Sequence, residues 1–237
     1  MNLPDPLVVV PARGGSKRLS RKNVRRLGGL SLIGWTMATA RAAGLSQVLL
    51  STDDDEIAAE GSALGYWQPF RRSSELAKDD VTTLAVVLNL LDWCRDTFHR
   101  EPELVMLLQP TSPFRTTTLI NEARLRLTQR PASEAVISVK RLHVPLGQVC
   151  TDVEGVLDHV SRADDVRPVY APSGALYLNR SSALRTHSTF LPPSCMWIAH
   201  DGLSTLDIDT PDDWAIAEAM VAAGRARPSF DMESKEQ

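Results

Sequence analysis

The sequence lacks any long uninterrupted apolar stretch, and it contains few cysteines and few aromatic residues. None of its apolar runs approaches the roughly 18 residues that a membrane-spanning helix needs, and its N-terminus shows neither the basic start nor the apolar run of a secretion signal. The three cysteines, Cys94, Cys150 and Cys195, are far apart and lack the spacing of a metal site. These absences predict a cytoplasmic protein without a membrane partner, whose thiols have structural roles.

Acidic residues are almost missing from residues 1–50, where Asp5 is the only one. One short segment of this region instead carries seven basic side chains, namely Arg13, Lys17, Arg18, Arg21, Lys22, Arg25 and Arg26. The whole chain has a net charge of -3 and only 5% aromatic residues, which argues against a nucleic-acid partner. Two explanations remain for the basic segment: a solvated surface, or a site for a small anionic ligand.

Short apolar runs alternate with amphipathic segments along the 237 residues. This pattern predicts a three-layer α/β fold of the Rossmann-like type, with a mainly parallel twisted sheet between helices. Strands are expected at residues 7–11, 47–51, 104–108, 135–139 and 175–178, and helices at residues 31–43, 54–64, 82–98, 211–223 and from the threonines 116–118 onward. The rhythm breaks over residues 141–172, which we interpret as a small insertion with a turn at 152–155. Residues 1–224 are expected to form one domain, and residues 225–237 a disordered tail.

The first expected strand runs directly into a glycine-rich basic loop, P-A-R-G-G-S-K-R. Gly14 and Gly15 allow backbone amides to approach a ligand closely, and successive amides form an anion-binding concavity. Arg13, Lys17 and Lys22 add cations suited to a triphosphate. The spacing matches neither the dinucleotide-binding fingerprint nor the phosphate loop of P-loop enzymes. The loop therefore indicates a phosphate site of another kind.

Two carboxylates near the C-terminus, Asp207 and Asp209, form a second candidate site. In a strand, residues i and i+2 project from the same face, so both side chains would point the same way. Adjacent carboxylates repel each other unless a cation lies between them, and Mg²⁺ prefers one or two carboxylates together with phosphate oxygens. The alternative is the end of a strand in which Asp209 caps the helix beginning at Pro211. The acidic run at residues 53–55 is interpreted as helix capping rather than as a metal cluster.

Four motifs follow one another along the chain: P-A-R-G-G-S-K with a later K-N, S-T-D-D at 51–54, L-Q-P-T-S-P-F-R at 108–115, and D-I-D-T at 207–210. Together they resemble the acylneuraminate cytidylyltransferase family, whose enzymes make CMP-activated sialic acids and related nonulosonic acids. The resemblance implies a nucleotidyltransferase fold and the transfer of CMP from CTP to an acidic sugar, with pyrophosphate released and Mg²⁺ as cofactor. It also implies a homodimer, because related enzymes pair through an insertion placed like residues 141–172.

The resemblance assigns roles to individual residues. Gln109, Ser173 and Tyr177 are expected to contact the acceptor sugar. Asp207 and Asp209 are the expected Mg²⁺ ligands. The residues expected to act in catalysis are Arg13, Lys22 and Asp209. The expected nucleotide-binding residues are Ala12, Arg13, Gly14, Gly15, Ser16, Lys17, Lys22, Asn23, Arg72, Thr82 and Thr83, with one of the two threonines near the cytosine.

Three acceptor-side positions depart from the sialic acid enzymes. Gly147 stands where those enzymes usually carry lysine, Ala171 where they carry arginine, and Ser173 where they carry asparagine. A lost charge-assisted hydrogen bond costs about 1.5–3 kcal/mol, so we expect an acceptor other than N-acetylneuraminate. The candidates to replace the missing charge are Arg141, Arg162 and Arg167. Three other functions stay open: a nucleotidyltransferase that uses another triphosphate and a sugar 1-phosphate, a sugar transferase, and a catalytically inactive nucleotide-binding relative.

Overall fold

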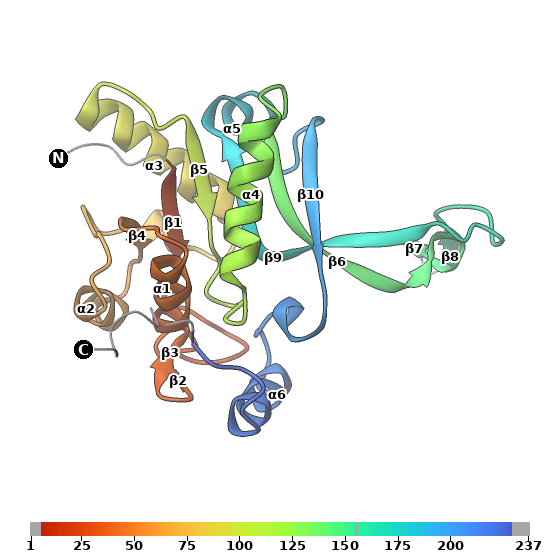
Figure 1. The fold of residues 1–237 in the computed structure, drawn as a ribbon, viewed down its shortest axis with the longest axis horizontal. Helices are drawn as coiled ribbons and strands as arrows, with labels where there is room; N and C mark the ends of the chain where they lie inside the picture. Colours follow the sequence, from red (N-terminus) through yellow and green to blue (C-terminus); the bar gives the residue numbers. More distant parts are fainter. Residues whose placement is uncertain (1–5, 155, 229–237) are drawn as a thin grey trace.

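A computed structural model describes residues 6–154 and 156–228 of the chain. Its centre is a six-stranded sheet with the strand order β10-β6-β9-β5-β1-β4 (Figure 1). The strands are β1 (Leu7–Pro11), β4 (Val48–Ser51), β5 (Leu104–Leu107), β6 (Ala135–Pro145), β9 (Pro168–Arg180) and β10 (Cys195–His200). Three neighbouring pairs are parallel, and β9 runs antiparallel to both of its neighbours. The prediction of a mainly parallel sheet is confirmed.

Helices cover both faces of this sheet. They are α1 (Leu32–Ala42), α2 (Asp55–Ala63), α3 (Thr83–Phe98), α4 (Thr117–Gln129), α5 (Ser181–His187) and α6 (Pro211–Ala222), with short 3₁₀ turns η1 (Ser74–Ala77), η2 (Leu146–Gln148) and η3 (Gly202–Thr205). Their starts follow the expected capping chemistry, because the side chains of Ser31, Asp54, Thr82 and Thr116 each accept a hydrogen bond from a backbone amide of the first turn. Asp54 therefore caps a helix, as predicted.

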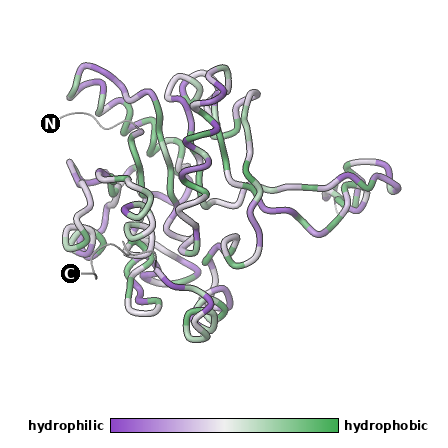
Figure 2. The backbone as a smooth tube through the Cα atoms, in the orientation of Figure 1, coloured by the Kyte–Doolittle hydropathy of each residue, from purple (hydrophilic) through white to green (hydrophobic). Residues whose placement is uncertain are grey.

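Alternate residues of the strands feed two separate apolar cores. Val8 and Val10 of β1 pack with residues of α1 and α4, whereas Leu7 and Val9 of the same strand pack with residues of α3 and α5. This alternation follows from the two-residue period of a strand, and it creates the three predicted layers. Figure 2 shows the central strands as mostly hydrophobic segments of the tube.

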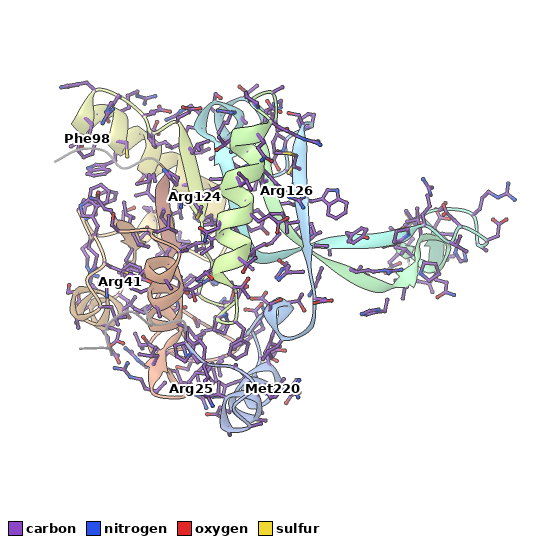
Figure 3. The ribbon with its side chains drawn as sticks, in the orientation of Figure 1. Arg25, Arg41, Phe98, Arg124, Arg126 and Met220 are labelled. Atoms are coloured by element: carbon purple, nitrogen blue, oxygen red, sulfur yellow. The ribbon has the colours of Figure 1, made fainter. Side chains whose placement is uncertain are left out.

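A third, smaller core joins α6 to a short hairpin formed by β2 (Arg26–Leu27) and β3 (Leu30–Ser31). The Arg25 guanidinium lies 4.3 Å from the centre of the Trp214 ring, and Figure 3 shows Arg25 beside α6. Ala226 is 9% exposed and belongs to this core. The predicted disordered tail is therefore wrong for residues 225–228, because burial of Ala226 holds that segment on α6. Residues 229–237 lie outside the described residues.

The predicted insertion at residues 141–172 forms an arm that projects from the body (Figure 1). The outer halves of β6 and β9 pair along its base, from the pair Lys140 and Ala171 to the pair Pro145 and Pro168. At its tip, β7 (Cys150–Val153) and β8 (Val156–His159) form a two-stranded hairpin. The two expected short strands are confirmed as β7 and β8, although residues 152 and 153 of the predicted turn belong to β7, and residue 155 lies outside the described residues. β6 and β9 are longer than predicted because they continue from the core into the arm.

One predicted strand is wrong. Residues 206–209 form an extended segment after η3 and have no ladder partner among residues 6–154 and 156–228. The Ile208 amide bonds this segment to the Thr111 carbonyl at 2.7 Å, Nζ of Lys22 donates to the Ile208 carbonyl at 3.0 Å, and the Ile208 side chain is fully buried. The sequence pattern missed β10 as an edge strand. No helix in the described part of the chain is long and apolar enough to cross a membrane.

Candidate functional site

The basic loop follows the end of β1, and hydrogen bonds to neighbouring segments fix its position. Its Ala12 amide donates to the Ser51 carbonyl of β4 at 3.0 Å, and the Gly14 amide donates to Oδ1 of Asp53 at 3.2 Å. Nδ2 of Asn23 donates to the Arg13 carbonyl at 3.1 Å. These bonds fix the loop's backbone, and they give Ala12, Asn23 and Asp53 positioning roles.

Gly14 is required by close packing rather than by its backbone angles. A Cβ atom at this position would lie 2.5 Å from Oδ2 of Asp54, which caps α2. Gly15 has open space around it, with nothing within 4 Å of a Cβ atom. The backbone at Gly15 is thus free for a ligand to approach.

The basic loop opens onto a cavity of about 500 Å³. Four segments far apart in the sequence line it: the loop itself, residues 72–86, the segment after β5, and the extended segment before α6. Of the predicted site residues, the cavity gathers Arg13, Ser16, Lys17, Lys22, Asn23, Arg72, Thr83, Gln109, Asp207 and Asp209. The sequence therefore predicted most of the polar residues that line this cavity.

Positive charge exceeds negative charge in this cavity. Its lining includes six cationic and three acidic side chains: Arg13, Lys17, Arg18, Lys22, Arg72 and Lys78 against Asp79, Asp207 and Asp209. Within the low-dielectric walls of a cleft, such a surplus attracts a polyanion. The arrangement suits a triphosphate better than a neutral ligand.

Two carboxylates neutralise part of this surplus. Nη1 of Arg13 lies 2.9 Å from Oδ1 of Asp79, and Lys17 forms an ion pair with the other oxygen of that carboxylate. The hydrogen bond from Lys17 is the main reason that the pKa of Asp79 is lowered. Nη2 of Arg18 and Nζ of Lys22 lie 2.6 and 2.5 Å from the two oxygens of Asp209.

Arg72 lies beneath the cavity with 7% of its surface exposed. Its Nε donates to Oγ of Ser51 at 3.1 Å, and a second guanidinium nitrogen donates to the Ser51 carbonyl. Burial lowers the pKa of Arg72 to about 10, an effect that Asp53 opposes and Arg13 adds to. The guanidinium therefore stays charged at neutral pH and is already oriented.

Asp207 and Asp209 face the same cavity although they do not form a strand. The buried Ile208 between them turns toward the core, which directs both neighbours outward. Oδ1 of Asp207 is buried and has no hydrogen-bond partner among the described residues. An orphaned carboxylate oxygen beside a second carboxylate is a fitting ligand set for a divalent cation.

Asp209 does not cap α6, which corrects one of the predicted alternatives. Oγ1 of Thr210 accepts from the Asp213 amide at 3.2 Å, and the Asp213 carboxylate accepts in return from the Thr210 amide at 2.8 Å. This reciprocal capping box satisfies the helix start without Asp209. Both Asp209 oxygens are left to the cavity and its cations. Within residues 6–154 and 156–228, no group of three or more His, Cys, Asp or Glu side chains forms a metal cluster.

A second cavity of about 330 Å³ adjoins the first, and Thr83 and Gln109 line both. It also contains Thr82 and Tyr177. Thr82 uses its hydroxyl as the cap of α3. Burial, and to a lesser degree the charge of Asp207, raises the pKa of Tyr177, so its phenol remains a neutral donor. Gln109 thus connects the basic cavity with a less polar one.

Ser173 lines neither cavity. It is 4% exposed, and its hydroxyl lies 2.7 Å from that of Ser138 and 2.6 Å from Nε2 of His200. The next residue, Gly174, has a φ of +81°, and a Cβ atom there would lie 2.6 Å from Oε1 of Gln109. Ser173 is therefore buried next to Gly174, the residue that lies against Gln109, and its own side chain does not face either cavity.

A second departure from the sialic acid pattern, Gly147, is also structural. Gly147 is buried, and a Cβ atom at this position would lie 2.5 and 2.6 Å from the carbonyl oxygens of Arg162 and Ala163. Arg162 and Arg167 form ion pairs with Asp164 and Asp165 on the arm, so they are already partnered. The backbone of the arm therefore leaves no room for a side chain at position 147, and this explains why no lysine is found there.

Sequence reasoning missed several groups that the fold brings to the site. Asp79 lies in a polar segment without a recognisable pattern, although it reaches the basic cavity, and Arg18 was noted in the basic segment but given no role of its own there. Arg115 was noted as part of a motif but given no role. It is 2% exposed, and it donates to the Ala175 carbonyl at 2.9 Å and to the Gln109 carbonyl.

The chain is similar to known proteins over nearly its whole length. A relative from Legionella pneumophila, CMP-N,N'-diacetyllegionaminic acid synthase, is 31% identical over 226 residues, covering 91% of this chain and 95% of the relative. Pseudaminic acid cytidylyltransferase from Campylobacter jejuni is 29% identical over 223 residues, covering 90% and 95%. The solved structure of CMP:2-keto-3-deoxy-manno-octonic acid synthetase with CTP superposes with a TM-score of 0.66 at 17% identity, covering 93% of this chain and 100% of that one.

At 17% identity, the superposition on this solved structure supports the fold alone. The family assignment rests on the sequence comparisons. The model of the family described as "Cytidylyltransferase" matches residues 7–207. That range runs from β1 to Asp207 and includes the basic loop, Gln109 and the arm. The resemblance predicted from four motifs is confirmed: this chain belongs to the cytidylyltransferase family.

Proposed function

We propose that this enzyme transfers CMP from CTP to a nonulosonic-type acidic sugar and releases pyrophosphate. The observation that carries the proposal is the basic cavity, in which a surplus of cations faces two carboxylates across a space that also reaches Gln109. The sequence relatives named for CMP-legionaminic and pseudaminic acids support the choice of nucleotide and of acceptor class.

In this proposal, the triphosphate binds the cations of the basic loop. Arg13 and Lys17 exchange Asp79 for phosphate oxygens, and the preoriented Arg72 and the backbone around Gly15 complete the cradle. An acceptor hydroxyl oxygen forms a bond to the α-phosphorus, and the bond from that phosphorus to the pyrophosphate oxygen breaks. Lys22 lines the same cavity and would offset the negative charge of the phosphates. Positioning of the substrates and electrostatic stabilisation would then account for most of the rate acceleration.

Asp207 and Asp209 would hold Mg²⁺, which supplies charge neutralisation for the phosphates when bound. The unpartnered Oδ1 of Asp207 supports this assignment. The acceptor would lie toward the second cavity, where Gln109 and Tyr177 offer polar contacts. Free thiols at Cys94, Cys150 and Cys195 support a reducing, cytoplasmic location for the reaction.

A pyrophosphate-release assay tests this function. Each of the four nucleoside triphosphates is combined with N,N'-diacetyllegionaminic acid, pseudaminic acid, N-acetylneuraminate and 2-keto-3-deoxy-manno-octonic acid. We expect release with CTP alone, efficient turnover of at least one acceptor, and poor turnover of N-acetylneuraminate. Release from another triphosphate with a sugar 1-phosphate would replace the proposal with the related reaction. CTP binding without any turnover would identify an inactive relative.

We further propose that the enzyme is a homodimer joined through the arm. Exposed apolar side chains gather there: Val144, Val153, Val156, Leu157, Val160, Val166 and Tyr170. Leu157 and Val166 are 74% and 84% exposed, and Figure 3 shows side chains standing out from the arm on all visible sides. Apolar surface gathered on one projection is typical of a protein–protein interface.

Light scattering with a substituted arm tests the dimer. The wild type should have about twice the chain mass of 26.0 kDa, and Leu157→Lys should reduce it to the chain mass. The matched control is Leu125→Lys on α4, where the original side chain is 56% exposed but outside the arm. A monomeric wild type, or a dimer that Leu157→Lys leaves intact, would contradict the assignment.

A further inference from the structure

A buried hydrogen-bonded chain crosses three neighbouring strands below the acceptor side of the site. His200 ends β10, Ser138 lies on β6 and Ser173 lies on β9. Nε2 of His200 is 2.6 Å from Oγ of Ser173, which is 2.7 Å from Oγ of Ser138, which accepts from the Leu176 amide at 2.9 Å. Both hydroxyls belong to residues less than 5% exposed, so water does not compete for these bonds.

The other imidazole nitrogen continues the chain toward the surface. Nδ1 of His200 lies 3.0 Å from Oγ of Ser204, which donates to the Asp201 carbonyl at 2.7 Å. Because the Ser204 proton is used there, Nδ1 must carry the proton of a neutral imidazole. Nε2 is then an acceptor for the Ser173 hydroxyl, while Ser138 accepts from the Leu176 amide and donates to the Leu176 carbonyl at 3.2 Å.

Protonation of His200 changes the bonds of Ser173. Nε2 becomes a donor to Ser173, and the Ser173 hydroxyl is then left to donate to Ser138, 2.7 Å away. The acceptor of the Ser173 hydroxyl therefore changes with the charge of an imidazole on another strand. A single protonation event on β10 is thereby transmitted to β9.

The far end of the chain adjoins Gln109. Gly174, directly after Ser173, lies so close to the Gln109 side chain that a Cβ atom there would be 2.6 Å from Oε1. Arg115 ties the same turn to the same residue, because it donates to the Ala175 carbonyl at 2.9 Å and to the Gln109 carbonyl. Residues 173–176 and Gln109 therefore form one hydrogen-bonded unit at the boundary of the two cavities.

We propose that neutral His200 is a positioning residue for the acceptor sugar, acting through Ser173 on the turn that packs against Gln109. This inference rests on the function proposed above, and it gives the departure at Ser173 a purpose. Where the sialic acid enzymes have an asparagine, this chain has a small hydroxyl that links the turn to an imidazole. The acceptor's affinity then depends on the protonation of His200.

The charged groups around His200 determine the direction of this dependence. Burial lowers the pKa of His200 below its ordinary value of 6.5, the Arg115 guanidinium lowers it further, and Asp201 opposes both. Lys140, the register neighbour on β6, adds another positive charge on this side. His200 is therefore neutral at pH 7, and the ordered chain is lost as the pH falls through its lowered pKa.

Steady-state kinetics with CTP and N,N'-diacetyllegionaminic acid provide the first test. His200→Ala should raise the KM for the sugar about tenfold at pH 7.5, the equivalent of one lost hydrogen bond and its ordering effect, and change the KM for CTP less than twofold. His200→Gln keeps an acceptor for Ser173 but cannot titrate. It should restore the sugar KM and abolish the rise that the wild type shows at low pH.

A second readout needs no turnover. An NMR titration of the imidazole signals, assigned with His200→Gln, should place the pKa of His200 below 6.5, and Ser173→Ala should move it. His187→Gln, which removes an imidazole bonded to Glu134 at 3.0 Å, should leave both readouts unchanged. An ordinary His200 pKa would overturn the proposal, as would a sugar KM that His200→Ala leaves unchanged. If the wild type turns over no sugar, the function fails, while the titration still decides whether the chain exists.

Discussion

The nucleotide end of the molecule and the arm differ in how their functional surfaces are held. The cations of the basic cavity lie on segments anchored to buried strands, and internal carboxylates partly neutralise them before any ligand arrives. The arm is held mainly by pairing between neighbouring strands, and its apolar side chains remain exposed. The difference teaches that one region is preorganised within the chain, whereas the other presents an exposed apolar surface, through which we propose that the homodimer forms.

The largest expected effect comes from removing one charge at the preorganised end. Asp209→Asn should lower kcat/KM at least about 100-fold, or about 2.7 kcal/mol, because Lys22, Arg18 and the proposed Mg²⁺ all lose their carboxylate. Stability should fall by no more than about 1 kcal/mol, since the ion pairs are partly exposed. Pyrophosphate release over a range of Mg²⁺ concentrations, together with thermal melting, measures both quantities.

Asp212→Asn is the matched control, because it removes the same charge from an exposed position in the first turn of α6. It should be as active as the wild type. If Asp209→Asn folds and turns over normally at limiting Mg²⁺, the metal assignment is wrong, and the nucleotide end is less preorganised than its geometry indicates.

Two substitutions should shift CTP affinity in opposite directions. Lys17→Ala should weaken binding by about 1.5–3 kcal/mol, because a charged hydrogen bond to phosphate is lost. Asp79→Asn should strengthen binding a few-fold, because Arg13 and Lys17 no longer have to leave a carboxylate. Isothermal titration calorimetry measures both, with Arg124→Ala on the exposed side of α4 as control. Equal shifts of the same sign would show that Asp79 does not compete with phosphate.

The smallest expected effect tests whether the arm has internal constraints of its own. Gly147→Ala should cost about 1–3 kcal/mol, because its Cβ atom would overlap the carbonyl oxygens of Arg162 and Ala163. Gly15→Ala, with open space around it, should leave the melting temperature nearly unchanged. Thermal melting compares the two variants. A Gly147→Ala variant as stable as the wild type would mean that the arm adapts, and that lysine is absent there for another reason.

Local chemistry made much of the fold predictable. Strands such as β1 and helices such as α3 have clear apolar periods and capping residues, and they were located to within a residue or two. The register of β9 against β6 was beyond prediction, because pairing between strands depends on long-range packing rather than on local pattern. For the same reason β10 was missed, since an exposed edge strand with a half-buried pattern lacks a strong apolar signal.

The site was predictable where residue type alone suggests chemistry, as for Lys17 and Asp209. It was not predictable where a residue acts through its neighbours. Ser173 was predicted to contact the acceptor sugar because of its position in the family pattern. In the fold it is buried beside Gly174 and hydrogen-bonded to His200 instead. Asp207 and Asp209 were placed together by a strand argument that proved wrong, although the alternation around a buried Ile208 gave the same result.

The bond between Lys22 and Asp209 joins residues 187 positions apart. A ribosome adds roughly 5–20 residues per second, so the basic loop is synthesised about 10–40 s before its carboxylate. During that interval Arg18 and Lys22 have no Asp209 to neutralise them. A nascent or truncated chain that ends before residue 207 therefore offers its cations to RNA and other large polyanions. Synthesis of the last segment converts that indiscriminate attraction into selectivity for a small polyphosphate.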